Sequence, residues 1–128
     1  MSELLPRPTD AELEILNVLW TRGPSTVREV HAELAERKRV GYTTVLKFLQ
    51  IMSEKGLVRR DDSRRAHIYQ VILPREETRG QLVRDLLDRA FSGSAGRLVM
   101  HALSETRATP EEIAEIRKIL DDLEGSAP

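Results

Sequence analysis

The order of helix and strand signals over residues 9–73 is the feature that most constrains the fold of this chain. Thr9 and Glu12 can form a capping box, in which each side chain accepts a hydrogen bond from the other residue's backbone amide. Leucines then recur at helical spacing until Gly23-Pro24, where the helix must end because glycine and proline interrupt helical backbone. The residues that follow therefore begin a new element.

Two further helices are predicted before the chain becomes extended. Thr26 and Glu29 form a second capping box, at the start of a short helix whose apolar stripe ends at Leu34. A third helix opens at Tyr42-Thr43-Thr44, with one of the two threonines as its expected N-cap, and ends at Lys55-Gly56. Its apolar stripe consists of Val45, Phe48, Leu49 and Met52.

Two extended runs follow, Leu57–Arg60 and Ala66–Leu73, and a polar turn joins them. The second run alternates with the period of a strand, and one of its faces carries His67, Tyr69 and Val71. Three helices followed by a hairpin is the order of a winged helix-turn-helix. We therefore expect a mainly α (α+β) fold in which residues 1–73 form a winged helix-turn-helix DNA-binding domain with a small β-hairpin wing.

The third helix is the candidate DNA-reading element. In a helix-turn-helix the second helix of the pair enters the major groove, where each base pair presents a distinct pattern of donors and acceptors. The face opposite its apolar stripe carries threonine, glutamine and lysine, which can bond base edges or phosphates, and a leucine that can meet a thymine methyl group. The candidate DNA-binding residues on and beside this helix are Arg39, Tyr42, Thr43, Thr44, Leu46, Lys47 and Gln50.

The charge distribution points to the same partner. The 128-residue chain has 20 basic and 21 acidic residues, yet its segment Arg37–Arg65 holds 9 basic and 3 acidic ones, a net charge of +6. Such a segment attracts a polyanion, because neutralised phosphates release their counterions. In the wing, Arg60, Arg64 and Arg65 are the candidates for binding phosphate or an adjacent minor groove. Double-stranded DNA is therefore the expected partner.

Each of these features can also be explained by surface charge or side-chain packing, without DNA binding. A cluster of charge is often ordinary solvated surface, and Asp61 and Asp62 can pair with the wing arginines and reduce their attraction for phosphate. Leu46 can pack on a neighbouring side chain instead of facing a base. A winged helix can also be a protein–protein interaction module without specific DNA binding, and this is the alternative function for the chain.

Residues 74–128 are predicted to form a helical dimerisation domain. A fourth helix begins near Glu76–Thr78, Ser94 caps a fifth, and Thr109-Pro110-Glu111-Glu112 is the clearest helix-start signal in the chain. Three helices within roughly 50 residues cannot bury their apolar stripes alone, because cores of this size are marginal. The candidate dimerisation residues are Leu82, Leu86, Leu98, Val99, Leu103, Ile113, Ile116, Leu120 and Leu123.

A second copy of the chain is the expected partner of these apolar stripes, since two-fold dimers are the commonest oligomers. The alternative is a monomer in which the helices fold back on residues 1–73. A two-fold dimer presents two DNA-reading helices and therefore predicts a pseudo-palindromic target.

Composition excludes several classes of site. Without cysteine the chain has no disulfide, thiolate nucleophile or cysteine-based metal site, and its three histidines lack metal-ligand spacing. No cofactor is expected, and no phosphate loop or nucleophile arrangement supports an enzyme. No apolar run approaches the roughly 20 residues that span a bilayer, and residues 1–8 lack the pattern of a signal peptide. We therefore expect a cytoplasmic protein that is not an enzyme.

Several segments, in order, resemble the BlaI/MecI family of penicillinase and methicillin-resistance repressors. Residues 9–20 resemble the opening helix of the family, and residues 42–46 and 54–58 resemble its recognition helix and the exit into the wing. Residues 91–103 and 111–123 are similar to the middle and last parts of its dimerisation region. The resemblance covers about residues 7–124.

The resemblance implies a homodimeric transcriptional repressor that binds operators with dyad symmetry. In the penicillinase branch of the family, a membrane sensor with a cytoplasmic metalloprotease domain triggers cleavage in the dimerisation region, which releases the DNA. The Asn-Phe bond that is cut in the best-known members is replaced here by His101-Ala102, the candidate cleavage region, and the typical recognition-helix arginine is replaced by Ile51. A copper-sensing branch uses a cysteine-rich tail, which the absence of cysteine excludes.

Overall fold

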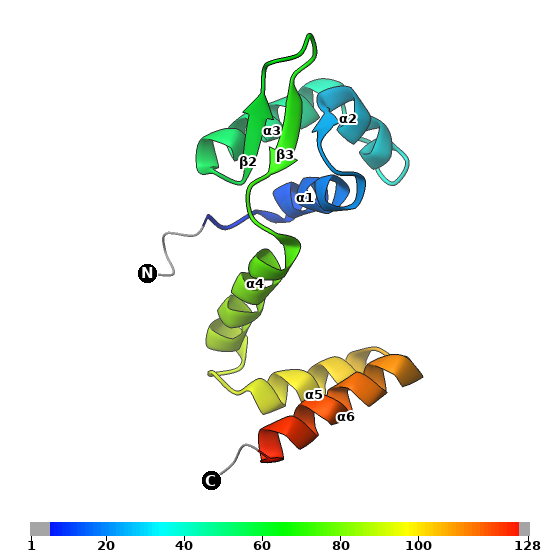
Figure 1. Cartoon of the computed structure of the whole chain (residues 1–128), viewed down its shortest axis with the longest axis vertical. Coiled ribbons are helices and arrows are strands. Elements are labelled where there is room, and N and C mark those ends of the chain that lie inside the picture. The colour runs from blue at the N-terminus through cyan, green and yellow to red at the C-terminus, as the bar shows by residue number, and fades with distance from the viewer. Residues whose placement is uncertain (1–5, 126–128) are drawn as a thin grey trace. The chain divides into compact units, whose positions relative to one another are not determined.

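The structure is a computed structural model that describes residues 6–125, and nine helices and strands lie within that range (Figure 1). The expectation that residues 1–8 carry no signal peptide concerns residues 1–5, which lie outside the described residues, and residues 6–8, which lie within them. The chain divides into two units, Met1–Gly80 and Gln81–Pro128. In chain order the elements are α1 Asp10–Arg22, β1 Ser25–Thr26, α2 Val27–Ala35, α3 Tyr42–Lys55, β2 Val58–Asp61, β3 Ile68–Val71, α4 Arg75–Ala90, α5 Ala95–Glu105 and α6 Pro110–Gly125.

The predicted start signals of the first two helices are confirmed. At α1 the Thr9 amide donates to Glu12 Oε1 at 2.9 Å, and the Glu12 amide donates to Thr9 Oγ1 at 3.2 Å. Thr26 and Glu29 make the same reciprocal pair at α2. α1 ends as predicted at Gly23, whose φ of +91° strongly favours glycine and whose amide donates to Leu19 O.

The predicted N-cap of α3 is wrong. Neither threonine caps the helix, because Gly41 occupies that position in an extended conformation and its carbonyl accepts from the Val45 amide at 3.2 Å. No side chain caps this helix end. Thr43 and Thr44 consequently lie within the first turn, and both are exposed. Their hydroxyls are thus not used to close the helix.

The strands form one antiparallel sheet in the order β1-β3-β2. β2 and β3 make the predicted hairpin, in which Arg60 pairs with Tyr69, and its tip extends away from the helices of this unit (Figure 1). β1 was not predicted, because two residues are too few to show alternation, and it is defined by the pairing of Ser25 with Tyr69. The sheet therefore ties the start of α2 to the wing.

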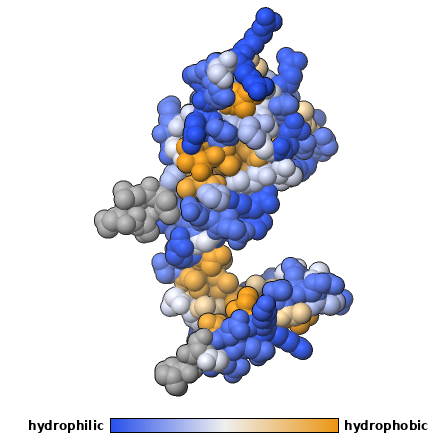
Figure 2. All heavy atoms as spheres, viewed as in Figure 1, coloured by the Kyte–Doolittle hydropathy of each residue, from blue (hydrophilic) through white to orange (hydrophobic). Residues whose placement is uncertain are grey.

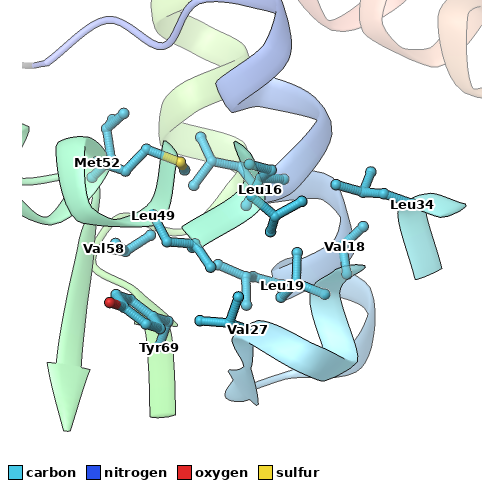
Figure 3. Packing of buried hydrophobic residues seen from close by; sticks show 13 residues of the cluster. Leu16, Val18, Leu19, Val27, Leu34, Leu49, Met52, Val58 and Tyr69 are labelled. Atoms are coloured by element: carbon cyan, nitrogen blue, oxygen red, sulfur yellow. The ribbon is translucent and has the colours of Figure 1, made fainter. Parts of the chain in front are cut away.

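The hydrophobic core of the first unit joins α1, α2 and α3 to the hairpin (Figure 3). Leu46 was expected on the exposed face of α3, but it is only partly exposed and packs against this core. This agrees with the alternative that Leu46 packs on neighbouring side chains. The core residues are Ile15, Leu16, Val18, Leu19, Val27, Val30, Leu34, Val45, Leu49, Met52, Leu57, Val58 and Tyr69.

Polar contacts hold the segment after β3 against α1. The Trp20 indole Nε1 donates to the Leu73 carbonyl at 3.2 Å, and the Arg75 guanidinium lies 5.6 Å from the centre of the Trp20 ring. Arg75 also donates to the hydroxyl of Thr21 at 3.1 Å. These contacts fix the first turn of α4 within the first unit.

The second unit has capped helices but exposed apolar side chains, and Figure 2 shows some of these at its surface. The break after α4 uses positive φ at Ser92 and Gly93, and Ser94 caps α5 as predicted. Thr109 and Glu112 form the predicted capping box of α6. Within the described residues, neither α5 nor α6 has a buried side chain. No helix in the described part of the chain is long and apolar enough to cross a membrane.

Candidate nucleic-acid interface

The outer face of α3 presents polar side chains with no partner in the described part of the chain. Thr43, Lys47 and Gln50 are exposed at spacings of four and three residues, so they share one helix face. Thr44 is exposed beside them. None of the four makes a side-chain hydrogen bond or ion pair with another described residue. Their bonding capacity is therefore available to a ligand.

Packing beneath that face fixes the position of α3. Val45, Leu49 and Met52 are all 0% exposed and join α3 to the core. At its first turn, the Tyr42 ring meets the His31 ring edge-on, with 6.0 Å between centroids, and His31 Nε2 lies 2.9 Å from the Val40 carbonyl. Tyr42 is 46% exposed, so it is held by α2 and still reachable from solvent.

A groove runs between the starts of α2 and α3 and the beginning of β3. Leu46 lies on its apolar part, and the exposed cations Arg28 and Arg65 line it together with His67. Because no side chain caps α3, the positive end of that helix also faces solvent. The groove therefore combines an apolar contact with groups that attract phosphate.

Arg28 is not among the DNA-binding residues predicted from the sequence, because it lies outside the basic segment 37–65. The signal that could have found it is its position in the first turn of α2, the short helix that precedes α3, next to the buried Val27. Arg39 is exposed in the connector between α2 and α3. It lines neither this groove nor a second groove, described below, between α3 and the hairpin.

In the wing, one arginine is paired. Arg60 Nε lies 2.7 Å from Asp62 Oδ1, and this carboxylate raises the pKa of the Arg60 guanidinium. Asp61 accepts from the Ser63 amide at 2.9 Å, and its hydrogen bonds to Ser63 lower its pKa, with a smaller effect from the charge of Arg64. The pairing of a wing acid with a wing arginine is thus confirmed for Asp62 and Arg60.

A second groove separates the C-terminal half of α3 from the hairpin and brings Gln50 together with Arg59, Arg60 and Asp62. Arg65, by contrast, lines the groove at the start of α3. Arg59 and Arg60 therefore lie beside the C-terminal half of α3, and Arg65 lies beside its start. The sequence alone could not predict which groove each arginine lines, because that depends on the register of the hairpin.

The candidate dimerisation residues lie in the second unit without a core of their own. Of the twelve exposed large hydrophobic side chains found among the described residues, nine lie between Val83 and Leu123, whereas the whole core lies between Ile15 and Tyr69. Leu82, Leu98 and Ile116 are half-buried. The exposed candidates are Leu86 at 48%, Val99 at 41%, Leu103 at 46%, Ile113 at 41%, Leu120 at 52% and Leu123 at 65%.

The candidate cleavage bond lies inside a helix. His101 and Ala102 are both exposed near the middle of α5, and the His101 ring meets Phe91 edge-on at 5.8 Å. Ala102 lines a groove between α5 and α6 with Leu103 and Ile116. Residues 6–125 contain no cluster of three or more histidine, cysteine or acidic residues able to hold a metal ion.

Comparison with known proteins identifies the family. The model of the penicillinase repressor family matches residues 8–122. The transcriptional regulator BlaI of Mycobacterium tuberculosis is 36% identical over 122 residues, which cover 94% of this chain and 87% of that protein. The penicillinase repressor of Staphylococcus aureus is 21% identical, with 88% and 90% of the two chains covered.

A solved structure supports the fold. The crystal structure of the transcriptional regulator Tm0710 from Thermotoga maritima superposes with a TM-score of 0.51 at 20% identity, over 91% of this chain and 74% of that one. The expected mainly α architecture with a small antiparallel sheet is confirmed. The family match extends through both units of the chain, from α1 into α6. The chain therefore belongs to the penicillinase repressor family, the BlaI/MecI family that its sequence resembles.

Proposed function

We propose that this chain is a homodimeric transcriptional repressor that binds a pseudo-palindromic operator in double-stranded DNA. The observation that carries the proposal is the outer face of α3, where Thr43, Lys47 and Gln50 are exposed beside a basic hairpin and have no side-chain partner among residues 6–125. Relatives of the chain are named as transcriptional regulators and repressors. The proposed role involves no catalysis and no cofactor.

Each part of the surface has a proposed task. Lys47 and Gln50 reach base edges in the major groove, where their donors and acceptors can distinguish base pairs. Thr43, Thr44 and Tyr42, at the start of α3, bind the DNA backbone together with Arg65 and Arg28 across the groove. Leu46, being held on the core, supplies an apolar contact only at the edge of this surface. Arg39 and Arg64 add attraction for phosphate from more distant positions.

Self-association is proposed to cover the apolar side chains of the second unit. Leu120 and Leu123 are more than half exposed in the single chain, and exposing large apolar side chains to water is unfavourable. A two-fold dimer presents two copies of α3, which would match half-sites roughly 34 Å apart or a multiple of that distance. Two linked half-site contacts bind far more tightly than one.

Release from DNA is proposed to act through the second unit, because loss of the dimer uncouples the two half-sites. The family resemblance implies cleavage triggered by a membrane sensor metalloprotease, with the repressor in the cytoplasm. Cleavage at His101-Ala102 would require α5 to open locally first, since the bond lies within a helix. An inducing signal that loosens this unit would have the same effect without cleavage.

Binding to the DNA upstream of the protein's own gene tests the proposal. A labelled native fragment and a scrambled fragment of equal length are titrated by fluorescence anisotropy at two salt concentrations, and the native fragment is then footprinted. Tight binding to the native fragment alone, with a footprint of two-fold symmetry, is the expected result. Weak and equal binding to both fragments that disappears with salt would mean phosphate attraction only. That result, combined with binding to a protein partner, would favour the interaction-module alternative.

A further inference from the structure

The wing contains an acidic residue in the middle of its arginines. In sequence, Arg59-Arg60 precede and Arg64-Arg65 follow the pair Asp61-Asp62, and Asp62 holds Arg60 at two points. Arg60 Nε lies 2.7 Å from Asp62 Oδ1, and Arg60 Nη2 donates to Oδ2 at 3.2 Å. A two-point contact of this kind fixes the plane of a guanidinium as well as its position.

The pair lies beside the reading helix. Arg60 is the cross-strand partner of the buried Tyr69, and the groove that contains Arg60 and Asp62 is also lined by Gln50 of α3. Asp62 Oδ1 additionally lies 3.7 Å from His67 Nε2, so this carboxylate contacts side chains from both arms of the hairpin. The Arg60 and Asp62 side chains remain 41% and 53% exposed, which leaves the pair accessible to DNA.

The pair affects two kinds of DNA binding differently. Binding to arbitrary sequence depends almost entirely on the number of cations that neutralise phosphates, so an acid that cancels an arginine weakens it. Binding to a preferred sequence also depends on side chains held in the geometry that a base edge or a defined phosphate requires. An acid that both cancels the charge of an arginine and orients its side chain therefore weakens binding to arbitrary sequence more than binding to the preferred sequence.

We propose that Asp62 is a specificity-determining residue of the wing, which orients Arg60 beside Gln50 and restrains its attraction for phosphates of any sequence. This inference rests on the proposed DNA-binding function. Asp62 itself is a positioning residue, since it acts through Arg60 and carries the same charge as the DNA.

Asp62→Asn tests the inference, with Asp61→Asn as its matched control. The two substitutions each remove one negative charge from adjacent positions of the wing, and asparagine at 61 can still accept from the Ser63 amide. Only the first breaks the pair with Arg60. Each variant and the wild-type protein are titrated with the native upstream fragment and with its scrambled counterpart between 0.05 and 0.3 M salt, after thermal unfolding has shown that the fold is retained.

For Asp62→Asn we expect tighter binding to the scrambled fragment, by roughly eightfold at 0.1 M salt for each subunit whose wing meets the DNA, because each added phosphate contact steepens the salt dependence by about one unit. The ratio of native to scrambled affinity should fall several-fold. Asp61→Asn should leave that ratio within about twofold of the wild-type value. Adding Arg60→Gln to Asp62→Asn should remove the gain on scrambled DNA, since Arg60 supplies the new contact.

Two results would overturn the inference while leaving the proposed function intact. The first is that the wild-type protein prefers the native fragment and the Asp62→Asn variant shows the same ratio of native to scrambled affinity. The other is an equal fall in the ratio for Asp61→Asn, which would make general charge the cause. A wild-type protein that shows no preference for the native fragment would overturn the proposed function and this inference together.

Discussion

Lys55 Nζ lies 2.6 Å from Glu12 Oε1, and this ion pair joins the last turn of α3 to the first turn of α1. The Glu12 side chain is 3% exposed, and the same oxygen atom accepts from the Thr9 amide in the capping box. Lys55 also donates to the Arg7 carbonyl at 3.0 Å. One carboxylate therefore closes the start of α1 and holds the end of α3.

Lys55→Met should destabilise the first unit by about 2 kcal/mol. Removing the lysine leaves Glu12 as a buried carboxylate without its counter-charge, which costs roughly 3–5 kcal/mol in a fully buried pair. The expected loss is smaller because Lys55 is 33% exposed. Urea unfolding followed by Trp20 fluorescence measures the change, since Trp20 is the single tryptophan and contacts Leu73 and Arg75.

Lys38→Met is the matched control for that measurement. Lys38 Nζ lies 2.8 Å from Glu14 Oε1, but both side chains are about half exposed at 45% and 46%. Exposed pairs contribute little, so the unfolding free energy should change by no more than about 0.5 kcal/mol. Equal losses for the two variants would contradict the structural role assigned to the pair of Lys55 and Glu12.

The same carboxylate makes stability depend on pH. Burial acts to raise the pKa of Glu12, but the hydrogen bond from Lys55, the bonds from Thr9 and the charge of Lys55 together outweigh it and lower the pKa below 4.5. A carboxyl with a lowered folded-state pKa stabilises the fold above its unfolded pKa, and this stability is lost as the pH falls through the folded pKa. The loss therefore begins near pH 4.5 and continues below it.

Glu12→Gln isolates this contribution. Glutamine can keep the capping box but cannot ionise, so the variant should be less stable than wild type at pH 7 and approach it as the pH falls below 4.5. Some acid sensitivity should persist in the variant, because the Thr26 backbone bond and neighbouring contacts also lower the pKa of Glu29. Urea titrations between pH 3 and 7 give the comparison. A stability difference that stays constant over this range would exclude Glu12 as the titrating group.

Much of the fold could be predicted because its signals are local. The capping boxes that begin at Thr9, Thr26 and Thr109 depend on two residues three positions apart, and all three are present as expected. The periodic leucines and valines likewise predicted the helices that build the core. Short-range hydrogen bonds and helical spacing are properties of the sequence itself.

The features that were missed depend on residues distant in the chain. β1 exists because Ser25 pairs with Tyr69. The sequence places Lys55 at the end of the third helix but does not show its partner Glu12, which lies 43 residues away. The N-cap of α3 shifted to Gly41 because the backbone of the connector, and not a side chain, sets where the helix starts. Such contacts follow from the packing of helices and hairpin, which the sequence pattern does not specify.

For DNA recognition, Lys47→Ala should weaken operator binding by roughly 1–3 kcal/mol and relax the preference at one position in each half-site, if the lysine contacts a base. Lys47 is exposed and makes no ion pair with the described residues, so its loss should not disturb the fold. Titration against a set of singly substituted operators measures both effects, with Lys118→Ala in α6 as the control. A uniform loss on every operator would assign Lys47 to phosphate alone.

For the proposed dimer, Leu120→Asp should dissociate the two chains, because a charge buried without a partner is costly. Leu120 is 52% exposed in the single chain, so aspartate there should leave the fold of one chain intact, and Ile116→Asp on the same helix should act in the same direction. Sedimentation velocity should show a monomer whose Trp20 emission is unchanged, and operator affinity should fall because the half-sites are no longer linked. Lys118→Asp, a charge change on the same helix outside the apolar stripe, should remain dimeric. A Leu120→Asp protein that still sediments as a dimer would remove this residue from the interface and place the contact elsewhere among the exposed apolar side chains of the second unit.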